Sequence, residues 1–188
     1  IENEIKNCLS LLKISPKNFF DIGANKGEYT NYLLKVKPNL ECHIFEPSIK
    51  NFEKLKNRFS QKNIFINNIG LSNSNKKSTL YSDYSGSGLA SLTKRRLEHF
   101  EVNMSFEETI ELQRFDNYWK NNNLILDYIK IDVEGHELAV LEGFGDLIER
   151  VRLIQFEFGG CNIDTRTFFK DFWYYFTEKE FLIFRITP

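Results

Sequence analysis

Four ionisable side chains stand close together in the second half of the chain. Lys130 interrupts an apolar run, and Asp132, Glu134 and His136 follow it at alternate positions. A histidine beside carboxylates can accept a proton near neutral pH. A lysine in an apolar run needs a partner such as Asp132 or Glu134, because an unpaired buried ammonium is costly. The stretch therefore predicts a proton-transfer site, and a structural ion pair with helix-capping acids is the plainer alternative.

A glycine-containing loop follows the first apolar run of the chain. It carries Gly23, Asn25 and Gly27, and Asp21 stands directly before it. Glycine lets a ligand approach the backbone closely, and the start of the next helix offers free N–H groups to an anion. Both a dinucleotide pyrophosphate and the carboxylate of a methionine group fit that description. The spacing departs from the dinucleotide pattern GxGxxG, and an acid at the strand end suits an ammonium group. A plain strand-to-helix turn is the alternative.

Glu46 ends the second apolar run and is followed by Pro47. It lies roughly 20 residues beyond the glycine loop, where a carboxylate can accept hydrogen bonds from both hydroxyls of a ribose. A surface glutamate at a strand end is the alternative. Together with the glycine loop, Glu46 favours an adenosyl-binding site.

Alternating strand and helix patterns indicate how these residues are positioned. Apolar runs predict strands at 19–22, 41–45, 63–67, 127–131, 151–156 and 181–186, and residues 80–81 fit a further strand. Helical spacing predicts helices at 1–13, 28–36, 48–58, 115–120, 136–144 and 165–177. Repeated strand–helix units indicate an α/β fold, a doubly wound, mostly parallel sheet with helices on both faces. Ligands bind beyond the carboxyl ends of such strands, so the three groups of residues should meet there.

Length and composition limit the functional classes. The chain has 188 residues and a net charge of −1, which predicts one domain over 1–188 and argues against nucleic-acid binding. The segment 94–100 holds the compact basic run and is expected to be exposed, and residues 84–88 are expected to form a flexible loop. The first residue is Ile1 rather than Met, which fits a domain trimmed at one or both ends.

The cysteine content bears on the compartment. Cys8, Cys42 and Cys161 are far apart and odd in number, so they indicate neither a disulfide framework nor a metal-binding pair. No apolar run approaches the roughly 18 residues of a membrane span. We therefore expect a cytoplasmic protein without a membrane span.

Three motifs, at 21–30, 45–47 and 129–137, resemble those of the FkbM-type methyltransferases in order and spacing. The resemblance runs over residues 19–157, and the regions 70–72 and 91–92 fit it more weakly. It implies the Rossmann-like class I methyltransferase fold and S-adenosylmethionine as cofactor. It also implies methyl transfer to oxygen, often on a sugar or another secondary metabolite, so the expected partner is a small-molecule or glycan acceptor. That fold usually has a seventh, antiparallel strand, whereas the run at 181–186 is only the sixth strand counted here.

The resemblance also implies residue roles. Cofactor-binding roles fall on Asp21, Gly23, Asn25, Gly27, Glu46, Ser72 and Asp132, of which Glu46 would bind the ribose and Ser72 would lie near the adenine. Asp132, Glu134 and His136, next to Lys130, would face the methyl group and the acceptor. His136 is the preferred base, because it stands at a helix start, where the helix dipole favours the neutral imidazole.

Three alternatives accompany this interpretation. Asp132, Glu134 and Glu157 are oxygen ligands suited to Mg²⁺ or Ca²⁺, although a metal is not expected. A nicotinamide-dependent oxidoreductase would use a related fold, but it needs a tighter glycine pattern. A catalytically inactive methyltransferase-like binding domain would keep the fold without needing the ionisable group around His136.

Overall fold

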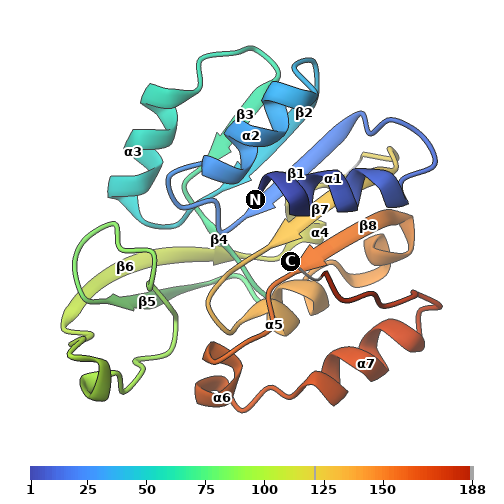
Figure 1. Ribbon diagram of the computed structural model, residues 1–188. Coiled ribbons are helices and arrows are strands. Elements are labelled where there is room, and N and C mark those ends of the chain that lie inside the picture. The colour runs from blue at the N-terminus through green and yellow to red at the C-terminus, as the bar shows by residue number, and fades with distance from the viewer. Residues whose placement is uncertain (121, 187–188) are drawn as a thin grey trace.

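The computed structural model describes residues 1–120 and 122–186, and its centre is a parallel five-stranded sheet (Figure 1). The strand order is β3-β2-β1-β7-β8, and every neighbouring pair is parallel. The strands are β1 (Asn18–Ile22), β2 (Glu41–Phe45), β3 (Ile64–Asn67), β7 (Leu126–Ile131) and β8 (Val151–Phe156). Their apolar runs are nearly continuous because both faces of the sheet are covered.

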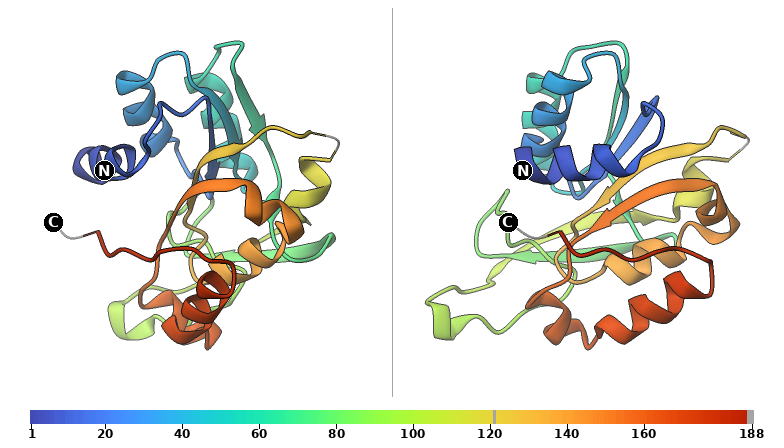
Figure 2. Two further views of the ribbon diagram at one scale, coloured as in Figure 1. Left: turned by 90° about the vertical axis from the view of Figure 1, so that its right-hand side faces the viewer. Right: turned by 45° about the vertical axis from the view of Figure 1, so that its right-hand side comes forward.

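Helices cover the two faces of this sheet (Figures 1 and 2). One face packs against α1 (Glu2–Leu11), α2 (Glu28–Val36) and α3 (Ile49–Arg58). The other packs against α4 (Phe115–Tyr118), α5 (Glu137–Glu142) and α7 (Phe169–Thr177), and α6 (Cys161–Thr165) precedes α7. Short 3-10 helices span Glu98–Phe100 and Gly145–Arg150. The predicted doubly wound fold is confirmed. No helix among the described residues is long and apolar enough to cross a membrane.

A second, smaller sheet lies at the side toward which the central strands point (Figure 1). It has the order β4-β6-β5, with β4 (Gly70–Leu71), β5 (Lys76–Ser82) and β6 (Phe106–Gln113). The sequence indicated only residues 80–81 of β5, and it gave no sign of β6. One face of β6 is exposed and carries Glu107 and Glu111, so the strand has no continuous apolar run. Between β5 and β6 runs a long loop, which we call the β5–β6 loop, residues 83–105.

Two expectations at the C-terminal end of the chain are wrong. Residues 181–186 form no strand, although Phe181 and Ile183 pack against the core. This apolar run packs beside α7, where Phe181 contacts the ring of Phe176, and the central sheet therefore has five strands. The helix expected at 165–177 begins only at Phe169, as α7, because Arg166, with a φ of +56°, ends the preceding helix α6.

Candidate functional site

One cavity lies beyond the carboxyl ends of β1, β2, β7 and β8. The predicted site residues that line it are Gly23, Asn25, Glu46, Asp132, Glu134, His136 and Glu157. Of the other predicted residues, Asp21, Gly27 and Ser72 are not among those that line it, and Lys130 lines a neighbouring groove. The structure thus brings the three sequence motifs together.

The glycine loop packs tightly against the end of β7. Gly23 has a φ of +79°, and a Cβ there would lie 1.9 Å from the carbonyl oxygen of Asp132. The backbone N–H of Gly23 donates to the carbonyl of Phe45 (3.0 Å), which ties the loop to β2 as well. Only glycine fits this position, because a side chain would separate β1 from β7. Gly27, with a φ of +76°, begins α2.

Glu46 is buried, and its carboxylate accepts hydrogen bonds from two backbone N–H groups. These belong to Asn25 (2.8 Å) and Ser48 (2.9 Å). Burial raises the pKa of Glu46 to about 7, although both hydrogen bonds act against that shift. The carboxylate therefore fixes the glycine loop and still has lone pairs with which it can accept a donor from the cavity.

Asp21 and Lys130 form an ion-pair group behind the cavity. Asp21 accepts a hydrogen bond from the hydroxyl of Thr30 (2.6 Å), and the ammonium of Lys130 lies 3.5 Å from Asp21 and 3.1 Å from Asp132. Burial lowers the pKa of Lys130, but the two aspartates outweigh it and raise that pKa. Lys130 therefore has Asp132 as a partner, as the sequence indicated, and Asp21 in addition.

The loop from Asp132 to His136 holds its acids in different environments. Glu134 adopts a φ of +55°, and its carboxylate accepts from Arg95 Nη1 (3.0 Å) and Cys161 Sγ (2.8 Å). The neighbouring carboxyl group of Asp132 and, after it, burial raise the pKa of Glu157 to about 7. Asp132 and Glu157 thus form a carboxyl pair at the cavity that can hold a proton.

His136 lines the same cavity. Its Nε2 lies 3.0 Å from the hydroxyl oxygen of Thr93. Burial, followed by the positive charge of Lys76, lowers the pKa of His136, so the imidazole is neutral near pH 7. A neutral imidazole at a cavity wall can accept a proton.

Residues of the β5–β6 loop belong to the site, and sequence reasoning missed them. Arg95 is buried, although most of the segment 94–100 around it is exposed, as expected. Its charge is tolerated because Glu134 and the carbonyl oxygen of Leu89 (2.8 Å) pair with it. No periodicity marks this loop, so only the need of an arginine for a partner could have indicated the contact.

Ser72 is packed between the second sheet and α5. It is buried, and its backbone N–H donates to the carbonyl of Gln113 (2.9 Å). Its own carbonyl lies so close to α5 that a Cβ on Gly143 would come within 2.2 Å of it. Ser72 therefore joins the second sheet to the end of α5.

The opposite wall of the cavity is apolar. It is formed by Leu80, Ala90, Leu92, Ile110 and Leu112.

The three carboxylates considered for a metal, Asp132, Glu134 and Glu157, do not form one ligand set, because Glu134 is engaged by Arg95. Within residues 1–120 and 122–186, no three histidine, cysteine or acidic side chains are placed to hold a metal ion.

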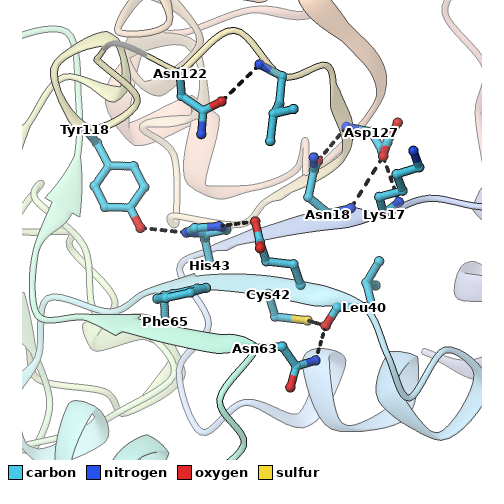
Figure 3. A network of polar contacts seen from close by, with 12 residues as sticks. Lys17, Asn18, Leu40, Cys42, His43, Asn63, Phe65, Tyr118, Asn122 and Asp127 are labelled. Atoms are coloured by element: carbon cyan, nitrogen blue, oxygen red, sulfur yellow. Dashed lines mark hydrogen bonds and ion pairs between the residues drawn. The ribbon is translucent and has the colours of Figure 1, made fainter.

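The other two histidines lie elsewhere. His43 is stacked between Phe20 and Phe65 on the sheet face, and its ring nitrogens contact Tyr118 (2.7 Å) and Glu41 (3.1 Å). Figure 3 shows this contact beside a polar network at the strand starts. His99 is exposed.

Comparison with known proteins places the chain in a family. Residues 21–183 match the family model described as the methyltransferase FkbM domain. The structure is similar to methyltransferase FkbM from Methylobacillus flagellatus KT, at 21% identity and a TM-score of 0.51, over 74% of this chain and 32% of that one. A weaker likeness, at 14% identity and a TM-score of 0.44, covers 80% of this chain and 41% of the plantazolicin methyltransferase BpumL in complex with SAH.

No curated protein matches the chain. The chain spans about a third of the length of the Methylobacillus protein. The family match covers most of the chain, and the chain therefore belongs to the FkbM methyltransferase family.

Proposed function

We propose that the protein is an S-adenosylmethionine-dependent methyltransferase acting on a hydroxyl oxygen of a sugar or another small metabolite. The observation that carries the proposal is the shared cavity. The glycine loop, Glu46 and His136 come from different strand ends, and all of them line it. Family membership supports methyl transfer as the reaction class.

The donor set of the cavity fits an adenosyl amino acid. Glu46 is a buried carboxylate with a raised pKa, so two hydroxyl donors from a ribose would stabilise its charged form. Gly23 and Asn25 bring backbone to the cavity wall, where the methionine portion would lie. Asp21 would act indirectly, because it holds Lys130 and Thr30 behind that wall.

The cofactor, when bound, supplies an activated methyl group, so the protein must orient the acceptor and remove a proton. Transfer of that methyl group to an acceptor oxygen would require the hydroxyl to give up its proton. His136 takes that proton, because its lowered pKa keeps it neutral and able to accept. Asp132 and Glu157 would accept hydrogen bonds from further hydroxyls, which favours a polyol acceptor. The three unpaired cysteines fit a reducing, cytoplasmic setting.

Ligand binding tests the cofactor assignment. Calorimetric titration with S-adenosylhomocysteine should show saturable binding, whereas NAD should not bind. Glu46→Gln should weaken the binding by roughly 10- to 100-fold, because a charged hydrogen bond contributes about 1.5–3 kcal/mol. Preference for NAD would favour the oxidoreductase, and absence of both affinities would favour the inactive binding domain.

Activity tests the acceptor. Transfer of a labelled methyl group should be sought with a panel of sugars and hydroxylated metabolites. His136→Ala should lower turnover by roughly 10²–10⁴-fold and leave the affinity for S-adenosylhomocysteine nearly unchanged. Equal losses of turnover and affinity would assign His136 to cofactor binding instead.

A further inference from the structure

The β5–β6 loop fastens the loop that carries the candidate base. Ser91 Oγ donates to the carbonyl of Glu134 (2.8 Å), and Thr93 Oγ1 lies 3.0 Å from His136 Nε2. Arg95 Nη1 donates to the Glu134 carboxylate (3.0 Å). The alternate side chains of Ser91, Thr93 and Arg95 thus face the loop from Asp132 to His136, as alternate side chains do in an extended strand.

The segment that makes these contacts is itself held in place. Ser91 and Tyr81 exchange both backbone hydrogen bonds, at 2.8 and 2.9 Å, which joins the segment to β5. The backbone N–H of Thr93 donates to Ser91 Oγ (3.2 Å). The side chain of Arg95 is only 5% exposed and anchors the far end. Thr93 is therefore fixed on both sides, and its hydroxyl can position a neighbour.

That neighbour is a histidine with two chemically different nitrogens. A neutral imidazole has one N–H donor and one bare acceptor nitrogen, and the hydrogen bond made by one nitrogen decides the state of the other. Nε2 of His136 faces Thr93, while Nδ1 has no hydrogen-bond partner among the described residues. The partner of Nε2 therefore sets whether Nδ1 can accept a proton.

We propose that Thr93 is a positioning residue for His136. The Nε2–H group donates to the hydroxyl oxygen of Thr93, and this contact leaves Nδ1 as the bare nitrogen that takes the proton of the acceptor. The resulting imidazolium keeps the Nε2–H bond to Thr93, so the ring need not turn between the two states. The catalytic meaning of this tautomer rests on the proposed function, whereas the tautomer itself can be observed without any substrate.

A purely structural contact would allow either direction of the hydrogen bond. If the Thr93 hydroxyl donated to Nε2, the proton of the imidazole would sit on Nδ1, and the bare nitrogen would be Nε2, which Thr93 already engages. Only the donor role of Nε2 leaves His136 with an acceptor nitrogen that Thr93 does not occupy. The identity of the protonated nitrogen thus separates a positioning role from a packing role.

Nitrogen NMR of ¹⁵N-histidine-labelled protein tests the proposal at about pH 8, where an unperturbed histidine is neutral. The chain has only three histidines, so His43 and His99 serve as internal references. We expect the wild type to carry its proton on Nε2 of His136. Thr93→Val should replace that single tautomer with a mixture, and Thr93→Ser should restore it. Thr109→Val, on an exposed position of β6, should change nothing.

Two outcomes would overturn the proposal: a proton on Nδ1 in the wild type, or an unchanged tautomer in Thr93→Val. If Thr93→Val does not fold, the wild type alone still decides through the first outcome. Titration of the same samples with S-adenosylhomocysteine keeps the two hypotheses apart. If the wild type does not bind S-adenosylhomocysteine, the proposed function is wrong. The tautomer of His136 would still show whether Thr93 positions the ring.

Discussion

The two ends of the central strands are built on different principles. At the strand starts, Asp127 accepts from the backbone N–H groups of Lys17 (2.7 Å) and Asn18 (3.4 Å), while Asn18 pairs in turn with the backbone of Asp127 (2.8 Å) (Figure 3). At the carboxyl ends, Glu134 stands at a positive φ, and Glu46 is buried with a raised pKa. The polar groups at the strand starts satisfy one another, whereas the carboxyl ends hold a strained backbone at Glu134 and a carboxylate, Glu46, that is costly to ionise.

This difference indicates where stability and function lie. Buried carboxylates that accept several backbone hydrogen bonds stabilise a fold. A carboxylate that is costly to ionise, and a non-glycine residue in the left-handed region, persist only when the surrounding structure enforces them. We therefore expect changes at the strand starts to act on folding alone, and changes at the carboxyl ends to act on ligand binding as well.

The largest effect is expected from Gly23→Ala. The new Cβ would overlap the carbonyl of Asp132, and the φ of +79° would strain the residue. Overpacking and backbone strain together should cost about 3 kcal/mol or more of unfolding free energy, and affinity for S-adenosylhomocysteine should be lost. Gly159→Ala is the control, since no atom lies within 4 Å of its Cβ. Chemical denaturation measures the unfolding free energy, and calorimetry measures the affinity. Wild-type affinity in Gly23→Ala would show that the glycine loop is not part of the cofactor site.

Asp127→Ala should be the next largest change, and it probes the strand starts. The backbone N–H groups of Lys17 and Asn18 would lose their acceptor, which should cost about 2–3 kcal/mol. Affinity for S-adenosylhomocysteine should stay within a factor of two, measured below the lowered melting temperature. Asp146→Ala, an exposed aspartate, should change stability by less than about 0.5 kcal/mol. A selective loss of affinity in Asp127→Ala would remove the distinction between the two ends.

The central sheet could be read from the sequence because its strands are buried on both faces. Predicted runs at 41–45 and 151–156 coincide with β2 and β8, and the helix at 28–36 coincides with α2. β6 was missed because one of its faces is solvated, so its apolar residues alternate with acids. The run at 181–186 is apolar like the buried strands, but it packs by side chains without joining the sheet.

Some residues of the candidate site could likewise be predicted from the sequence, and others could not. Parallel strands end at one edge, so Gly23, Glu46 and His136 could be placed together from their positions after predicted strands. Thr93 and Arg95 could not, because the β5–β6 loop has no period and its contacts depend on tertiary folding. The local pattern around Arg95 indicated a solvated charge, and burial against Glu134 overrode it.

The pH dependence of stability sharpens the comparison. The pKa of Glu46 is raised to about 7 by burial, so the folded state binds its proton more tightly than the unfolded state does. Its contribution is therefore most favourable below pH 4.5 and is lost as the pH rises to about 7. Glu46→Gln should reduce this loss, leaving the parts due to Glu157 and Glu137. The pKa of Glu157 is raised by its contact with Asp132 and by burial, and that of Glu137 is raised by burial. Denaturation midpoints between pH 5 and 8 measure the slope, and the exposed Glu53→Gln should keep the wild-type slope.

The smallest change expected is that of Arg95→Met, compared with Arg96→Met at the exposed neighbouring position. Removing Arg95 leaves Glu134 with Cys161 alone, but the side chain of Glu134 is 21% exposed and can be solvated. The loss of stability should therefore be about 1–2 kcal/mol, well short of the loss expected when a fully buried ion pair is broken. Because Arg95 anchors the segment that holds Thr93, Arg95→Met should also mix the His136 tautomers, which Arg96→Met should not do. Equal effects of the two substitutions in denaturation and NMR would show that the strained end of the sheet needs no support from the β5–β6 loop.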